Sequence, residues 1–133
     1  MKYQENNYIV LSDKNEIRSL INGFIFISSN EALKKSLINF SNKKGAFTSY
    51  IGFNFYDELD DYDKVGRAIN KDTILFTAES PAVEESCEAY LSFDEFYRYL
   101  EDGINQMIIN YPEKYNTLEI RDSLKGVKKS FGI

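Results

Sequence analysis

The sequence of 133 residues contains no histidine and only one cysteine. Histidine is the commonest general base and a frequent metal ligand, so its absence excludes the hydrolases, ribonucleases and zinc sites that depend on it. Cys87 alone cannot form an internal disulfide, a zinc site or an iron–sulfur site, and a lone thiol fits a reducing compartment. Its neighbours Glu84, Glu85 and Glu88 are expected to raise the pKa of the thiol, so we predict a structural cysteine.

Glycine patterns that bind phosphate and long apolar runs are also missing. Neither G-x-x-x-x-G-K-[ST] nor G-x-G-x-x-G occurs, so nucleotide binding has no support and we predict no cofactor. No segment approaches the roughly 18 apolar residues of a membrane span, and residues 1–8 are too polar for a secretory signal. These features predict a cytoplasmic protein without a membrane partner.

The chain is nevertheless apolar enough to fold. Its hydrophobic content of 43% and aromatic content of 15% exceed those of acidic disordered tails. The length is close to the commonest domain size, and no repeat, low-complexity tract or linker divides the chain. We predict a single domain over residues 1–133.

Two helices are predicted in the first third of the chain. Ser12 and Asp13 are candidate caps for the first helix, whose apolar residues recur at helical spacing: Ile17, Leu20, Ile21, Phe24 and Ile25. Residues 24–27 can alternatively be interpreted as a short strand. Asn30 is a candidate cap for the second helix, with Ala32, Leu33, Leu37 and Phe40 facing inward. This helix is expected to end at residues 43–45, with Gly45 in the left-handed cap.

Three strands are predicted in the middle of the chain. In residues 47–55 the apolar period changes to two, which predicts one strand with Phe47, Ile51, Phe53 and Phe55 on its buried face. Residues 73–77 and 88–91 predict two further strands, which pair antiparallel across a turn at Ser80-Pro81.

Ser92 and Glu95 give the strongest local signal, a capping box at the start of a helix. The apolar stripe of that helix is Phe96, Tyr97, Leu100, Ile104, Met107 and Ile108, before Pro112. Thr117 is predicted to cap a last helix with Leu118, Ile120, Leu124 and Val127 inward. Helices at both ends around a small antiparallel sheet predict an α+β fold, with N-terminal and C-terminal helices packed against the sheet.

Charge is divided unevenly along the chain. Residues 57–102 contain 14 acidic and four basic side chains, a net charge of −10, whereas the remainder carries +5. Tyrosine and phenylalanine are interleaved with the acidic residues. Such a surface attracts a basic partner and repels nucleic acid.

The acidic run at residues 57–66 has several interpretations. A calcium-binding loop starting at Asp61 lacks a ligand at Val65 and has Asp72 where a bidentate glutamate is usual. A two-metal nuclease would also use clustered carboxylates, but no catalytic lysine motif accompanies them. A solvated loop is the ordinary interpretation of a charge run. The continued acidic bias and the tyrosines instead favour an electrostatically steered interface.

Three parts of the chain together resemble a known protein family. They are residues 45–57 (GAFTSYIGFNFYD), the acidic loop that follows, and residues 89–100 (AYLSFDEFYRYL). Together they resemble the immunity proteins of contact-dependent growth-inhibition systems, particularly the ribonuclease toxin immunity group. The resemblance implies a non-enzymatic, cytoplasmic bacterial protein that binds the C-terminal domain of a cognate toxin. It assigns no individual site residue, because the binding residues vary with the toxin.

Physical reasoning favours the same function. A nuclease toxin is basic where it grips RNA or DNA, and an acidic inhibitor can steer to that surface. We therefore predict stoichiometric inhibition of a nuclease toxin, which the resemblance implies is a ribonuclease, without nucleic-acid binding and without catalytic or metal-binding residues. A metal-dependent carboxylate nuclease and a general acidic interaction module are the alternatives, and a homo-oligomer stays open. Tyr56 and Tyr62 are predicted to be the aromatic anchors of the interface. The complete set of predicted toxin-binding residues is Tyr56, Asp57, Glu58, Asp60, Asp61, Tyr62, Asp63, Glu84, Glu85 and Glu88.

Overall fold

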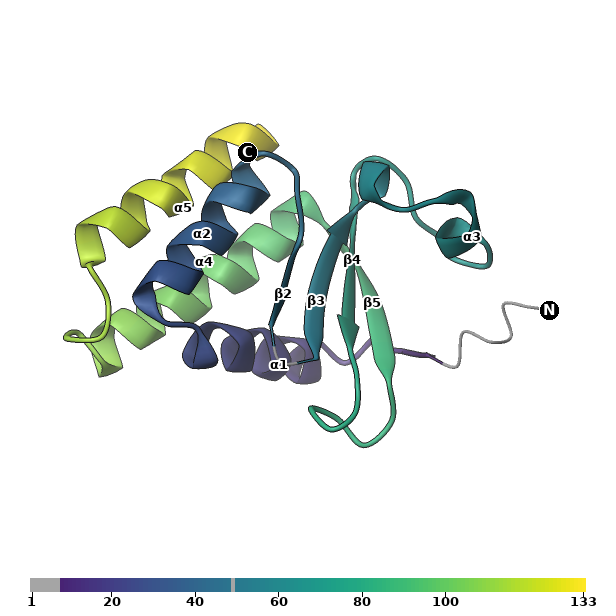
Figure 1. Ribbon diagram of the computed structural model, residues 1–133, viewed down its shortest axis with the longest axis horizontal. Helices are drawn as coiled ribbons and strands as arrows, with labels where there is room; N and C mark the ends of the chain where they lie inside the picture. The colour runs from purple at the N-terminus through teal and green to yellow at the C-terminus, as the bar shows by residue number, and fades with distance from the viewer. Residues whose placement is uncertain (1–7, 49) are drawn as a thin grey trace.

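The computed structural model describes residues 8–48 and 50–133, which form one mixed assembly of helices and strands (Figure 1). In chain order the elements are β1 (Ile9–Val10), α1 (Lys14–Ile27), α2 (Asn30–Ser41), β2 (Ala46–Thr48), β3 (Ile51–Phe55), the 3-10 turn η2 (Tyr56–Glu58), α3 (Asp61–Lys64), β4 (Thr73–Ala78), β5 (Cys87–Ser92), α4 (Phe93–Asn110) and α5 (Thr117–Phe131).

The strands form one sheet in the order β1-β5-β4-β3-β2. The pair β1 and β5 is parallel, and the other neighbours are antiparallel. Helices α1, α2, α4 and α5 lie on one side of the sheet, whereas α3 lies on the other side (Figure 1). The predicted α+β class, the antiparallel pairing of β4 with β5 and the helices at both ends are confirmed.

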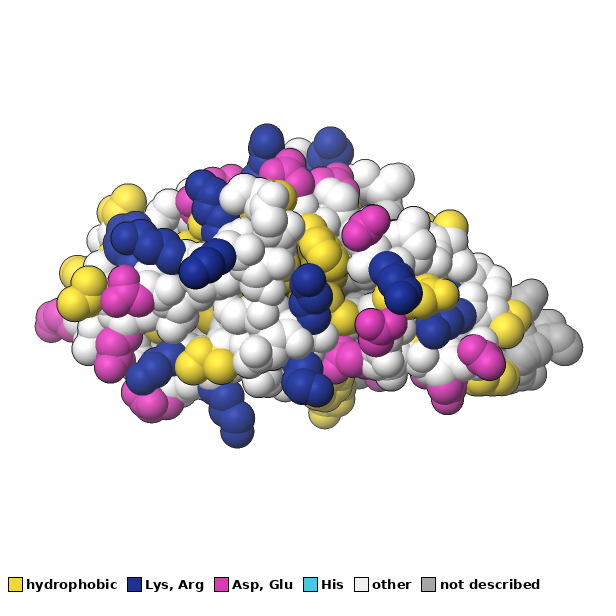
Figure 2. All heavy atoms as spheres, turned by 90° about the horizontal axis from the view of Figure 1, so that it is seen from above, with side chains coloured by type: hydrophobic (Ala, Val, Ile, Leu, Met, Phe, Trp, Pro, Cys, Tyr) yellow, Lys and Arg dark blue, Asp and Glu magenta, His cyan; other side chains and the backbone are white. Residues whose placement is uncertain are grey.

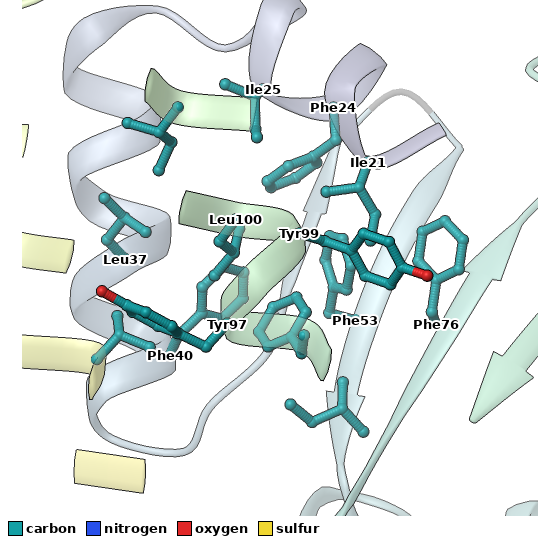
Figure 3. Packing of buried hydrophobic residues seen from close by; sticks show 14 of the residues in the cluster. Ile21, Phe24, Ile25, Leu37, Phe40, Phe53, Phe76, Tyr97, Tyr99 and Leu100 are labelled. Carbon is teal, nitrogen blue, oxygen red and sulfur yellow. The ribbon is translucent and has the colours of Figure 1, made fainter. Parts of the chain in front are cut away.

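The core lies between the sheet and the long helices, with Phe53 of β3 at its centre. Phe24 of α1, Phe40 of α2 and Phe76 of β4 contact Phe53, and Figure 3 shows Phe24 and Phe76 beside it. Edge-to-face contacts join Phe53 to Phe24 at 4.9 Å and to Phe40 at 5.6 Å between ring centroids. Phe76 stacks on Phe53 at 5.2 Å, and Phe96 of α4 lies 5.0 Å away. One ring therefore links five elements.

Helix α4 begins at the predicted capping box. The Ser92 hydroxyl oxygen accepts a hydrogen bond from the Glu95 amide at 3.1 Å, and the Glu95 carboxylate accepts one from the Ser92 amide at 3.1 Å. Two amides that the helix itself cannot satisfy are thus paired. Leu100 and Ile104 on the predicted stripe are buried, which confirms that the stripe faces the core.

Replacing Ser92 by alanine should lower the free energy of unfolding by about 1 kcal/mol, because the Glu95 amide loses its acceptor. Urea denaturation measures this change. Ser12→Ala is the matched control, since the cap of α1 is Asp13, whose carboxylate accepts hydrogen bonds from the Asn15 and Glu16 amides. The control should stay within about 0.5 kcal/mol of the original protein. Equal losses in the two variants would contradict the cap assignment.

Several predicted helix ends are wrong by one or two residues. Ser29, not Asn30, caps α2, and its hydroxyl oxygen accepts from the Ala32 amide. The left-handed residue after α2 is Lys43, with φ of 55°, and not Gly45. Gly45 is required for another reason: a Cβ there would lie 1.8 Å from the Phe53 carbonyl oxygen.

Three further helix predictions need correction. Residues 24–27 belong to α1, so the alternative of a short strand there is wrong. Asn116, not Thr117, caps α5. Ala32 and Leu118 were predicted to face the core but are exposed, with Leu118 at 72%. Both residues lie in the first turn of their helix, on the side away from the core, whereas Leu33 and Ile120 of the same turns are buried.

The predicted strand over residues 47–55 is two strands joined by a turn. Tyr50 has φ of 71° in this turn, and β2 folds back antiparallel on β3. Phe47 pairs with Gly52 and therefore points to the sheet face opposite Phe53. It is 65% exposed, so its predicted burial is wrong.

Candidate functional site

The connection between β3 and β4, residues 56–72, is called the α3 segment here. It contains six acidic and three basic residues. In Figure 1 it projects from the sheet on the side away from the long helices. The side chains of Asp57, Asp61 and Tyr62 are exposed, with Tyr62 at 61%. The structure thus brings most of the predicted toxin-binding residues together on one projection.

Glu58 anchors the start of the α3 segment to the sheet. One of its carboxylate oxygens accepts a hydrogen bond from the Phe55 amide at 2.7 Å, and the other accepts one from the Gly45 amide at 2.9 Å. These bonds tie η2 to β3 and to the chain just before β2. The negative charge of Glu58 is therefore partly committed to local structure.

Asp60 and Tyr56 also make contacts within the segment. The Asp60 carboxylate accepts a hydrogen bond from the Asp63 amide at 2.8 Å and so caps α3. The Lys64 ammonium lies 4.1 Å from the centre of the Tyr56 ring, a cation–π contact. Of the two predicted aromatic anchors, Tyr62 is exposed and Tyr56 is half-buried.

Glu88 is not on the surface, which corrects its assignment to an exposed interface. Its side chain is 2% exposed and accepts hydrogen bonds from Arg67, at 3.1 Å from Nε and 2.9 Å from Nη2. The Tyr90 hydroxyl donates to the same carboxylate. Arg67 also donates through Nη1 to the Asp63 carbonyl oxygen at 2.7 Å. This cluster of Arg67, Glu88, Tyr90 and the Asp63 carbonyl is called the Arg67 clamp.

Arg67 and Tyr90 of the Arg67 clamp each keep one protonation state near neutral pH. Burial lowers the pKa of Arg67, but the hydrogen bonds and charge of Glu88 outweigh burial and raise that pKa above its ordinary value. Burial, followed by the hydrogen bond to Glu88, raises the pKa of Tyr90 to about 12. The guanidinium therefore stays charged and the phenol stays protonated.

Glu84 and Glu85 lie apart from the α3 segment. They are exposed in the loop between β4 and β5, at the opposite end of the strands from η2 (Figure 1). The six residues of β4 separate the two ends by roughly 20 Å at the rise of an extended strand. The predicted toxin-binding set is thus divided between two ends of the sheet.

The charge of the surface is mixed where it can be seen. Figure 2 looks down on the end of the molecule that carries η2, and its acidic side chains are interspersed with lysine and arginine. The carboxylates on this face do not merge into one continuous patch. Any steering by the α3 segment must therefore come from its own exposed carboxylates.

The carboxylates and the thiol offer little for catalysis. Asp61 and Asp63 lie in one helical turn, and among residues 8–48 and 50–133 no three Cys, Asp or Glu side chains converge to hold a metal ion. Cys87 is buried at 5% exposure. Burial, and then the charges of Glu16 and Glu88, raise the pKa of its thiol, so the predicted direction is confirmed although Glu16 replaces Glu84 and Glu85 as a cause.

Comparison with known protein families identifies a match. A family model described as CDI immunity protein matches residues 17–124, which is more than half of the chain. The matched range runs from α1 into α5 and includes the α3 segment and the Arg67 clamp. No curated protein and no solved structure matches the chain. None of the helices in the described part of the chain is long and apolar enough to cross a membrane.

Proposed function

The chain belongs to the CDI immunity protein family, and we propose that it neutralises a cognate nuclease toxin by binding the toxin's C-terminal domain stoichiometrically. The family match is the observation that carries this proposal. We propose that the protein binds the toxin in the cytoplasm, which is consistent with a cysteine that forms no disulfide. We further propose that the toxin is a ribonuclease, because the sequence resembles the ribonuclease toxin immunity group.

Inhibition by binding suits the chemistry of this chain better than catalysis does. It has no histidine, and its only thiol is buried with a raised pKa. An enzyme would need carboxylates with a divalent metal, or a lysine or tyrosine with an activating partner. An inhibitor needs only a complementary surface with an aromatic anchor and surrounding charge.

We propose the α3 segment as the main toxin-binding surface. Asp57 and Asp61 expose carboxylates that can attract a basic nuclease surface, and Tyr62 exposes a ring that can be buried on binding. Charge complementarity of this kind raises association rates, which an immunity protein needs in order to capture a toxin before it acts. Glu84 and Glu85 lie too far away to belong to the same contact centre.

Growth protection tests the function directly. Cells that express the toxin domain encoded by the neighbouring gene should grow only when this protein is present. The two purified chains should form a one-to-one complex, measured by size-exclusion chromatography with light scattering, which also reports the oligomeric state of each free chain. Growth arrest despite the protein, together with the absence of a complex, would contradict the proposal.

The isolated protein should have no nuclease activity. We expect no cleavage when it is mixed with RNA or DNA and with magnesium, manganese or calcium, because stoichiometric inhibition requires no chemistry. The matched control replaces Asp60, Asp61 and Asp63 by asparagine. Reproducible cleavage that disappears in this variant would identify a metal-dependent carboxylate nuclease instead.

A further inference from the structure

The Arg67 clamp joins the projecting α3 segment to strand β5 of the sheet. One planar guanidinium donates to the backbone carbonyl of Asp63 in α3 and to the carboxylate of Glu88 in β5. The side chains of Arg67 and Glu88 are only 10% and 2% exposed. Both lie on the sheet face opposite the phenylalanine core, because Glu88 alternates along β5 with Cys87 and Ala89 of that core.

Stability alone does not explain a buried ion pair at this place. Removing two charges from water is costly, and replacing such a pair by apolar residues of similar volume is often neutral or stabilising. Apolar burial is available on the same face, since Leu75 of β4, which pairs with Tyr90, is 3% exposed. What an arginine fork supplies beyond apolar packing is a fixed direction for each of its hydrogen bonds.

We propose that Arg67 is a positioning residue for toxin binding, which holds α3 in one orientation and thereby presents Asp61 and Tyr62 in a preformed arrangement. This inference rests on the proposed function. A mobile loop loses conformational entropy when it becomes ordered on binding, and this loss weakens the affinity. A segment that is already held in its bound orientation loses less. The apparent affinity falls in proportion to the fraction of molecules in which a binding segment is correctly arranged.

A double variant separates positioning from stability. Arg67→Met together with Glu88→Met removes both charges, so neither is left buried and unpaired. The Asp63 carbonyl then loses its donor and the Tyr90 hydroxyl loses its acceptor, while the phenylalanine core is untouched. We expect amide hydrogen exchange in residues 57–66 to accelerate by about tenfold or more, whereas β4, β5 and the melting temperature change little.

Two further variants keep this test decisive. Arg67→Lys retains the charge but cannot direct bonds to Glu88 and Asp63 together, so the exchange rate should rise to an intermediate value. Asp94→Asn with Arg98→Met is the matched control, because it removes an ion pair whose side chains are 53% and 73% exposed on α4. The control should leave exchange in residues 57–66 unchanged. If the double variant does not fold, amide exchange in residues 57–66 is compared between Arg67→Lys and the control variant.

Binding to the toxin domain of the neighbouring gene supplies the functional measurement. The double variant should bind about tenfold more weakly if a tenth of its segments keep the bound arrangement. If amide exchange in residues 57–66 is unchanged in the variants, the Arg67 clamp does not hold α3 in place, and the inference is wrong. Accelerated exchange with unchanged affinity would overturn its role in positioning and leave the proposed function standing. Failure of the original protein to bind would overturn the proposed function without affecting the exchange result.

Discussion

Replacing Phe53 by alanine should lower the free energy of unfolding by about 3–5 kcal/mol. The ring is 1% exposed, and it contacts the rings of Phe24, Phe40, Phe76 and Phe96. Those rings belong to different elements, so the cavity left by alanine cannot close through one local shift. Urea denaturation at equilibrium should show a lower midpoint with an unchanged slope.

Phe47→Ala is the matched control for this loss. The same substitution is made six residues away in the sequence, on the neighbouring strand, where the side chain is 65% exposed. The change in unfolding free energy should stay within about 0.5 kcal/mol. Similar losses for the two variants would mean that Phe47 and Phe53 share the buried face that the sequence pattern predicted.

The sequence predicted the parts of the fold that depend on periodic burial. The stripes of α1 and α4 follow helical spacing, and Ile21, Phe24, Leu100 and Ile104 are all buried as expected. The capping box of α4 was also predicted, because its two hydrogen bonds lie within four consecutive residues. Signals of this kind need no knowledge of the rest of the chain.

Predictions failed where the path of the backbone, and not the pattern of side chains, determines which residues are buried. Phe47, Ile51 and Phe53 occupy odd positions, which suggested one strand, but the turn at Tyr50 reverses the chain and places Phe47 on the other face. Positive φ at Lys43 and Tyr50 has no sequence signal of the glycine type. The turn at Tyr50 is set by how β2 pairs with β3, and Lys43 lies where the chain leaves α2.

The candidate site could be predicted only in part for a similar reason. Composition identified Asp57, Asp61 and Tyr62, which the structure places on the exposed α3 segment. It also placed Glu88 on the surface, because an acidic residue among other acidic residues is usually solvated. Arg67 pairs with Glu88 from 21 positions away, and no local pattern records a partner at that distance. The available hint was Arg67 itself, which directly follows the acidic run at residues 57–66.

Reversing the charge of two carboxylates on the α3 segment should have the largest effect on toxin capture. In Asp57→Lys with Asp61→Lys the association rate with the toxin domain should fall roughly tenfold or more at low salt, since steering depends on complementary charge. Asp60 is left unchanged because its carboxylate caps α3. Stopped-flow association at several salt concentrations measures the rate, and the variant should show a flatter salt dependence.

Glu84→Lys with Glu85→Lys provides the same change in net charge at the opposite end of β4. The separation of roughly 20 Å along the strand exceeds the Debye length of about 8 Å at physiological ionic strength, so charges there act on a different region of an approaching partner. If the toxin binds the α3 segment, this variant should associate at nearly the original rate. If it slows association more than the Asp57 and Asp61 variant does, the toxin contacts the loop between β4 and β5, and the α3 segment is not its binding surface.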